Sequence, residues 1–463
     1  MTTVLRLLVA ALTVGGAGFG LTMLLVRRRP VFWENCALSW LLGTAVVSVA
    51  LWIAGFLLHG TALLMAVTAG CMLLFILGYQ RWRRIRGIQR TGAKSWTEIV
   101  FIGLFAFEYF WIYLLTIKQT LGWDGILVWE IKARYAFWNG GVLPAAYFRD
   151  PSRWFSNPDY PPLLPLVETW FYSWIGDCNQ FWIKFIFPFW YLAAASMLLM
   201  AVEELSGKRW IGWMIVLLFP FVPCLHNAAG GFQTGYADAP LSAIFLATTF
   251  YFLRFVRQNS TDDLRLFIAL GATLPWIKPE GVMLWAAISL CGVIAIGKRR
   301  NIRTATLSLL PGGFVIVLWH VFLHAVHALF PQDFLPVTPS VLRHNIGRTG
   351  VILHALWQQF IDWHDWDIFW VLVGIAVIAV VIRQRNSRGA TLVWLMAAAI
   401  TCYCVSYLFS NWTNYGVHIE VSLTRRLIQI TPIGWLLIAL ALRPWDRPRT
   451  VPSIKTTNAS PPA

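Results

Sequence analysis

The sequence has little charge. Of its 463 residues, 13% are Asp, Glu, Lys or Arg and 58% are hydrophobic, whereas a soluble globular domain carries about 25% charged residues. The deficit excludes a water-exposed surface around most of the chain. Long apolar runs recur, and a helix of ~20 mostly apolar residues crosses the ~30 Å hydrocarbon core of a bilayer. The composition therefore predicts an all-α polytopic membrane protein.

Other absences narrow the functional class. Of the seven cysteines, only Cys178 lies in an expected loop, so a disulfide framework is not expected. No Gly-x-Gly-x-x-Gly motif follows an expected strand, so nucleotide-binding machinery of the Rossmann type is not predicted. His324 and His327 have helical spacing but no carboxylate partners. No cofactor is therefore predicted, and the sequence gives no support for a divalent metal.

About thirteen apolar segments meet the hydropathy criterion for a membrane span. They are residues 4–26, 36–58, 61–80, 97–119, 181–202, 210–226, 238–256, 265–277, 281–297, 304–329, 367–382, 390–409 and 427–442. The eighth and ninth are short and meet at Pro279, so they form either two short spans or one re-entrant hairpin. The predicted fold also includes interfacial helices in a large first outer loop, residues 121–180, which is rich in Trp, Tyr, Phe and Pro.

The net charge of +16 is distributed as a topology signal. Most Lys and Arg residues form seven clusters: Arg27–Arg29, Arg81–Lys94, Lys208–Arg209, Arg254–Arg265, Lys298–Arg303, Arg383–Arg388 and Arg443–Lys455. Alternation of thirteen spans from an outside amino terminus places every cluster in the cytoplasm, as positive-inside bias requires. We therefore predict a plasma (inner) membrane protein with a cytoplasmic carboxyl terminus. Because the clusters form no single patch, a nucleic-acid partner is not expected.

The strongest candidate for chemistry is Asp124, which follows the fourth span in Gly122-Trp123-Asp124-Gly125. A carboxylate at the water–lipid boundary can take a proton from an acceptor hydroxyl. Alternatively, Asp124 caps a helix, although Leu127 stands where a capping box needs Glu or Gln. Lys132 lies roughly 80° from Asp124 around a helix. It either contacts a phosphate or extends its ammonium group toward the membrane interface.

Two further motifs on the outer side carry candidate ligands. Proline-rich residues 157–165 close the first loop, either as a rigid return or to hold Asp159 and Tyr160 against a bound headgroup. Arg425 and Arg426 lie outside, before the last span, where they oppose the positive-inside trend. They therefore need a compensating anion, which is either a bulk lipid headgroup or a dedicated phosphate ligand.

Ionisable residues within apolar regions are costly and often functional. Asp238 begins the seventh span, and Lys278 and Glu280 lie at the break between the two short spans, where they either form a site or neutralise each other. Glu108 lies in the middle of the fourth span, and we expect it to pair with Lys184.

These motifs, in this order and on one side, resemble the GT-C superfamily of membrane glycosyltransferases. The nearest likeness is to the protein O-mannosyltransferase and lipid A aminoarabinose transferase branch (family-39-like). It rests on Trp123-Asp124, Asp159-Tyr160-Pro161-Pro162-Leu163, Tyr236 to Leu241, Lys278 to Gly281 and, more loosely, Arg425-Arg426. The marks fall within residues 97–442, which would form the catalytic core. Residues 1–96 would be a three-helix extension, and 443–463 a disordered cytoplasmic tail.

The resemblance implies sugar transfer from a polyprenyl-phosphate donor to a glycan, lipid or protein acceptor at the outer face, with Asp124 as the general base. Gly125 stands where many relatives carry a second acidic residue. The chemistry needs cations for the departing phosphate and an apolar groove for the prenyl chain. The expected substrate-binding residues are Lys132, Asp159, Tyr160, Asp238, Lys278, Glu280, Arg425 and Arg426.

Two rival functions remain. A polysaccharide polymerase or ligase would use Arg343 and His344 in a late outer loop. A transporter would bind its substrate near the middle of the membrane, where a helix broken at Pro279 would form the site.

Overall fold

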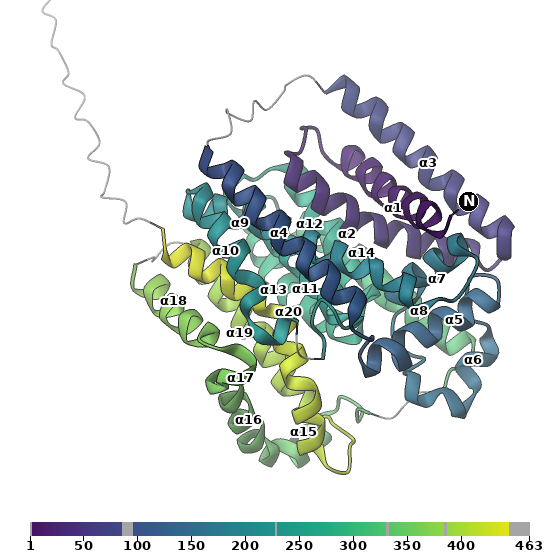
Figure 1. Cartoon of the computed structure of the whole chain (residues 1–463). Helices are drawn as coiled ribbons and strands as arrows, with labels where there is room; N and C mark the ends of the chain where they lie inside the picture. Colours follow the sequence, from purple (N-terminus) through teal and green to yellow (C-terminus); the bar gives the residue numbers. More distant parts are fainter. Residues whose placement is uncertain (1, 86–95, 227–228, 330–332, 384–386, 444–463) are drawn as a thin grey trace, which may run out of the picture.

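The computed structural model describes residues 2–85, 96–226, 229–329, 333–383 and 387–443. In these ranges every regular element is a helix, and one isolated β-bridge pairs Phe334 with Ser410. Ten helices are long and apolar enough to cross a membrane. The chain is therefore an all-helical, multi-pass integral membrane protein, as the composition predicts (Figure 1). The predicted tail, residues 444–463, lies outside the described residues.

Each of the thirteen predicted segments overlaps a helix. The ten long helices are α1 (Thr3–Leu25), α2 (Phe32–Ala54), α3 (Gly60–Arg84), α4 (Trp96–Lys118), α9 (Phe187–Ser206), α11 (Asp238–Gln258), α13 (Pro279–Arg299), α14 (Ile302–Ala325), α19 (Ser387–Tyr407) and α20 (Tyr415–Ala441). The other three are α10 (Arg209–Leu218), α12 (Thr261–Thr273) and α18 (Phe369–Arg383). These three fall below the length of the ten long helices, so length and composition alone assign ten crossings.

Shorter helices fill the connections. Residues 121–183 form a π-helical turn η1 (Gly125–Glu130), α5 (Ile131–Trp138), α6 (Ala145–Arg149), η2 (Pro151–Ser156), α7 (Leu163–Ile175) and α8 (Gln180–Ile183). The later connections contain η3 (Lys184–Ile186), η4 (Phe219–Phe221), η5 (Pro223–Leu225), η6 (Leu274–Trp276), α15 (Pro339–Asn345), η7 (Ile346–Arg348), α16 (Thr349–Ile361) and α17 (Trp363–Trp366).

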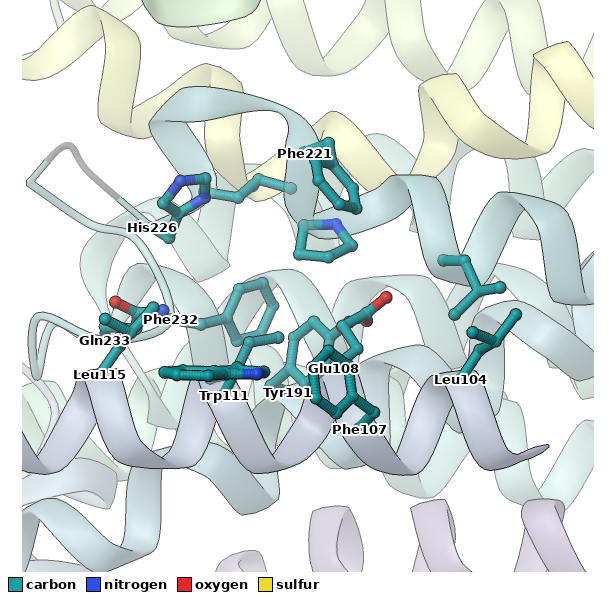
Figure 2. Close-up of a pocket in the computed structure, with 14 residues that line it drawn as sticks. Leu104, Phe107, Glu108, Trp111, Leu115, Tyr191, Phe221, His226, Phe232 and Gln233 are labelled. Atoms are coloured by element: carbon teal, nitrogen blue, oxygen red, sulfur yellow. The ribbon is translucent and has the colours of Figure 1, made fainter. Parts of the chain in front are cut away.

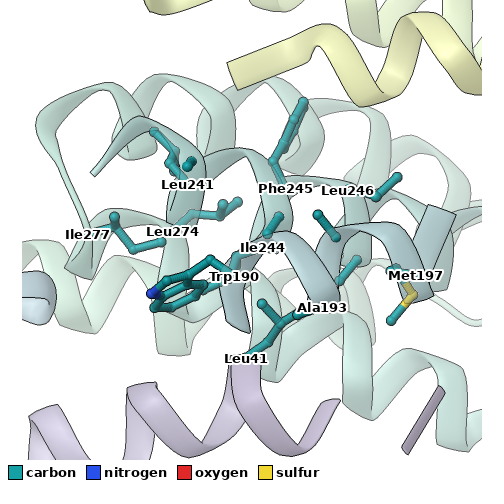
Figure 3. Close-up of a cluster of buried hydrophobic side chains, with 14 of the residues drawn as sticks. Leu41, Trp190, Ala193, Met197, Leu241, Ile244, Phe245, Leu246, Leu274 and Ile277 are labelled. Carbon is teal, nitrogen blue, oxygen red and sulfur yellow. The ribbon is translucent and has the colours of Figure 1, made fainter. Parts of the chain in front are cut away.

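The centre of the bundle is built on α9 and α11. Helix α11 is buried along almost its whole length. Trp190 of α9 lies among hydrophobic side chains of α2, α11 and residues 274–277 (Figure 3). Lipid offers no hydrophobic driving force between helices, so close packing holds them together. A Cβ at Gly18 would lie 2.0 Å from Ser39 O, and one at Gly43 would lie 2.1 Å from Val14 O. These glycines therefore let α1 and α2 approach closely.

The two ends of the bundle differ in composition. At one end, which we call the basic end, Arg27 N–H donates to Asp262, Arg81 to Val26 O, and Arg209 to Glu98. The opposite end, which we call the loop end, carries α5 to α8 and α15 to α17 (Figure 1). Basic residues that are far apart in sequence, Arg27, Arg81 and Arg209, thus lie at one end of the molecule.

Candidate functional site

Asp124 occupies the N-cap position of the π-helical turn η1, directly after α4, yet its side chain makes no capping hydrogen bond. Instead its carboxylate forms an ion pair with Arg425, whose Nη1 lies 2.7 Å from Asp124 Oδ2. Its own backbone N–H donates to Tyr236 Oη at 3.1 Å. Single π-turns often occur at functional sites. Asp124 thus stands at the cap position, but its side chain does not cap the turn.

Two glycines beside Asp124 allow a close approach between chain segments. A Cβ at Gly125 would lie 2.5 Å from Thr234 O, and one at Gly122 would lie 2.4 Å from the Tyr236 ring. The Gly122 N–H donates to Thr234 O at 2.8 Å. An acidic side chain at position 125 would collide with the backbone of residues 230–236. Packing therefore explains why no second carboxylate follows Asp124.

Asp238, the first residue of α11, is fully buried and accepts bonds from three side chains. Lys278 Nζ lies 2.8 Å from its Oδ1, and Gln429 Nε2 lies 2.5 Å from the same atom. Arg425 Nη2 lies 3.3 Å from Oδ2. Because Arg425 also contacts Asp124, one guanidinium joins the two predicted aspartates.

The break between α12 and α13 supplies the remaining charges. Lys278 has extended backbone and Pro279 begins α13, a favoured arrangement for a helix start. Glu280 Oε1 lies 3.6 Å from Lys278 Nζ and 3.7 Å from Arg426 Nε. Its Oε2 is buried without a hydrogen-bond partner. Arg426 also donates to Ser406 Oγ at 2.6 Å.

These six residues form what we call the loop-end network: Asp124, Asp238, Lys278, Glu280, Arg425 and Arg426. They come from the start of η1, the starts of α11 and α13, and the middle of α20. Its three cations and three carboxylates neutralise one another. The chain's own acids thus supply the anion that Arg425 and Arg426 were expected to require.

The other three predicted residues lie together beside this network. Lys132 is buried, donates to Asn157 O at 3.0 Å, and lies over the rings of Trp129 and Tyr160. Asp159 Oδ1 is buried without a hydrogen-bond partner. Burial lowers the pKa of Lys132 and raises that of Asp159, and their mutual attraction opposes both changes. The negative charge of Asp124 also opposes the lowering of the Lys132 pKa, so Lys132 and Asp159 lie next to the network.

Sequence reasoning did not select three residues that the structure adds. Tyr236 holds the backbone of Asp124 and stacks on Arg425, with the guanidinium carbon 4.6 Å from the ring centre. Gln429 contacts Asp238 from one helical turn beyond Arg425, and this spacing could have identified it. Glu168 of α7 is buried with neither oxygen hydrogen-bonded, and burial raises its pKa well above the usual value.

An apolar cavity of about 510 Å³ lies between α4, α9 and residues 217–233 (Figure 2). One face of α4 lines it from Leu104 to Leu115, which corresponds to about 17 Å along a helix. Phe107 on this face is 63% exposed, so the cavity opens toward the surroundings of the bundle. Gln233 lines the cavity beside Leu115 (Figure 2), and Gly230, in the same connection, lies against Arg425 and Asp238. Residues 230–236 therefore border both cavity and network.

Glu108 lies in this cavity and accepts a hydrogen bond from Tyr191 Oη. Lys184 instead donates to the backbone carbonyls of Ile117 and Gln119. The expected Glu108–Lys184 pair is therefore wrong, because Lys184 turns back to satisfy carbonyls at the end of α4, which a helix leaves without partners.

The residues of the rival polymerase or ligase lie elsewhere. Arg343 and His344 are on α15 and both are exposed. Within the described ranges, no cluster of three or more His, Cys, Asp and Glu side chains is arranged to hold a metal ion. Where Asp124 and Asp238 approach each other, the group between them is the Arg425 guanidinium.

No protein-family model matches the chain, and no curated protein and no solved structure shows significant similarity to it. Functional inference therefore rests on the site itself.

Proposed function

We propose that this protein is a membrane glycosyltransferase that moves a sugar from a polyprenyl-phosphate donor to an acceptor at the outer face of the membrane. The observation that carries the proposal is the convergence of Asp124, Asp238, Lys278 and Arg425, from four distant segments, on one network beside an apolar cavity. An activated sugar–phosphate bond needs these parts: a base, cations for the departing phosphate and space for an apolar chain. The architecture we propose is of the GT-C type, as the motif order suggests.

The cavity is the proposed location of the prenyl chain. Its lining is almost entirely aliphatic and aromatic, and it includes Gln233, three residues from Gly230, which lies against Arg425. Each buried methylene of a lipid chain contributes about 0.8 kcal/mol. A donor held in this way would present its phosphate to Arg425 and Lys278.

The ion pair between Arg425 and Asp124 suggests how donor binding prepares the base. Arg425 is 15% exposed and Asp124 is 23% exposed, whereas Asp238 is fully buried. An arriving phosphate competes for Arg425, since guanidinium groups bind phosphate through paired donors. Asp124 is then free to accept the proton of the acceptor hydroxyl. The acceptor oxygen attacks the anomeric carbon, the bond from that carbon to the phosphate oxygen breaks, and the configuration inverts.

The proposed topology has thirteen crossings, an outside amino terminus and a cytoplasmic carboxyl terminus in the plasma (inner) membrane. Positive-inside bias supports it, because the basic end gathers the arginine clusters. At the loop end Trp123, Trp138 and Trp154 are exposed, and aromatic side chains favour the membrane–water interface. Helices of the first loop would lie at that interface.

Reconstituted protein tests the proposal. Proteoliposomes are given polyprenyl-phosphate donors that carry labelled sugars, together with envelope extract as the acceptor source, and label transfer is measured. Asp124→Asn should reduce the rate by about 10²–10⁴-fold, the usual contribution of a general base. Asp177→Asn is the matched control, because Asp177 is an exposed aspartate at the same end. Full turnover by Asp124→Asn would contradict the proposal.

A further inference from the structure

A second cavity, of about 530 Å³, lies at the loop end, outside the network. We call it the outer cleft, and its described lining residues are Trp154, Asp333, Asn411, Trp412, Thr413, Asn414 and Val417. Trp154 is 47% exposed and Trp412 is 38% exposed. One face of the Trp412 indole stacks on the His418 ring, 4.8 Å between centres. The cleft thus presents two accessible indoles together with amide, hydroxyl and carboxylate groups.

The cleft is held in a fixed shape by backbone pairing. Leu335 N–H donates to Phe409 O at 2.7 Å, and Asn411 N–H donates to Asp333 O at 2.9 Å. Trp412 Nε1 donates to Asp333 Oδ1 at 3.0 Å, which orients the indole. Between the two paired residues Phe409 and Asn411, Ser410 O accepts a hydrogen bond from Arg348 Nη1 at 2.7 Å. A cleft formed in advance binds without first ordering its loops, which favours affinity.

The chemistry of the lining indicates the class of ligand. None of the seven described lining residues is a cation, and Asp333 brings a carboxylate, so the cleft is poorly suited to phosphate or to an anionic headgroup. Indole faces pack against apolar C–H surfaces, while amides and carboxylates bond hydroxyl groups from the side. A sugar ring presents both kinds of surface at once.

The position of the cleft connects it to the network. Val417 and Arg425 are eight residues apart on α20, or about 12 Å along the helix axis. From the other side, burial raises the pKa of both Asp159 and Tyr160, and the charge of Asp333 adds to both increases. The cleft and the network therefore share helix α20, and the cleft lies on the side of Asp159 and Tyr160.

We infer that the outer cleft is the acceptor subsite and that it binds a carbohydrate, with sugar rings against Trp154 and Trp412 and hydroxyl groups on Asp333 and Asn414. The inference rests on the proposed function, and it selects a glycan-bearing acceptor over a protein acceptor.

Direct binding tests the inference without requiring turnover. The full chain in nanodiscs is mixed with chitotriose, maltotriose or mannotriose, and saturation-transfer NMR reports contact with the sugar. Irradiation of the wild-type protein should transfer saturation to at least one of the three trisaccharides. Trp412→Ala and Trp154→Ala, on separate segments, should each weaken binding by about tenfold or more, or 1.4 kcal/mol. Trp363→Ala is the control, because Trp363 is 61% exposed at the same end and does not line the cleft.

The outcomes separate this inference from the proposed function. Asp124→Asn should bind the trisaccharide like wild type while losing transfer, because Asp124 is not part of the cleft. If sugar binds and Asp124→Asn retains full transfer, the cleft stands and the proposed mechanism fails. The inference is overturned if none of the three sugars receives saturation from the protein. It is also overturned if Trp412→Ala and Trp363→Ala lose sugar binding equally. Binding of a Ser/Thr-rich peptide in place of sugar would overturn it in favour of a protein acceptor.

Discussion

Two buried ion-pair networks lie at opposite ends of this helix bundle, and their surroundings differ. At the basic end, Glu34 of α2 accepts hydrogen bonds from Arg28 and from Tyr251 Oη, the latter at 2.8 Å, and Arg254 lies 3.6 Å away. Arg254 also lies 3.3 Å from Asp263 of α12. We call these five residues the basic-end network. Like the loop-end network, it joins segments that are far apart in the sequence.

The difference between the networks lies in the exposure of their carboxylates, because each network contains a partly exposed arginine. Glu34 is 1% exposed and is surrounded by its partners. In the loop-end network Asp124 is 23% exposed. Gly230, which lies against Arg425 and Asp238, belongs to a connection that also lines a cavity. Buried charge alone therefore does not mark a catalytic site, because a structural clamp between helices has the same composition. Mutation of a structural clamp should lower the stability of the fold. Mutation of a catalytic site should instead lower turnover.

The largest effect should come from Glu34→Ala. This change leaves Arg28 without its hydrogen-bonded carboxylate and Arg254 without one of its acidic partners, and breaking a buried pair typically costs about 3–5 kcal/mol. We expect a strongly lowered midpoint of thermal unfolding in detergent, with unchanged turnover per folded molecule. Glu203→Ala is the control, since Glu203 pairs with Arg209 at the same end but is 34% exposed, and such pairs contribute about 0–1 kcal/mol. Equal midpoints for the two variants would show that the basic-end network is no clamp.

Arg425→Lys should act on turnover. A lysine keeps the positive charge, but its single ammonium group cannot replace the two guanidinium nitrogens that contact Asp124 and Asp238 at the same time. We expect kcat/KM for the donor to fall about 10²-fold, or 2.7 kcal/mol, with a nearly unchanged unfolding midpoint.

Arg343→Lys is the matched control for Arg425→Lys, because Arg343 is an exposed arginine at the same end. It should change turnover by less than twofold. The opposite result, with activity kept in Arg425→Lys and lost in Arg343→Lys, would favour the polymerase or ligase.

Helix positions and the types of site residue could be predicted from the sequence, because both depend on local patterns. An apolar run of bilayer length forms a helix, and an acid or cation at its end is conspicuous. Asp124, Asp238 and Lys278 were identified in this way, and all three belong to one network.

Pairing could not be predicted, because it depends on how distant helices pack. Glu108 and Lys184 looked like natural partners by charge, yet Tyr191 and two backbone carbonyls are nearer. The same holds for Arg425, whose partners lie 187 or more residues away along the chain. The burial of Glu168 and the cavity along α4 likewise arise only when the helices come together.

The smallest predicted effect is a change in pH dependence at Lys132. Burial lowers the pKa of its ammonium group, against the opposing attraction of Asp159, Glu168 and Asp124. Lys132 is therefore charged below its lowered pKa and neutral above it. As pH rises through that pKa, the positive charge that favours the donor phosphate disappears, and transfer should decline by a few-fold.

Lys132→Arg tests this explanation, since a guanidinium stays protonated throughout the accessible range. The variant should lose the alkaline decline while keeping its activity at low pH. Lys118→Arg is the control, because Lys118 is exposed at the end of α4 and should leave the profile unchanged. The same alkaline decline in wild type and Lys132→Arg would assign it to another group. Lys132 would then hold residues 157–160 in place rather than contribute charge to donor binding.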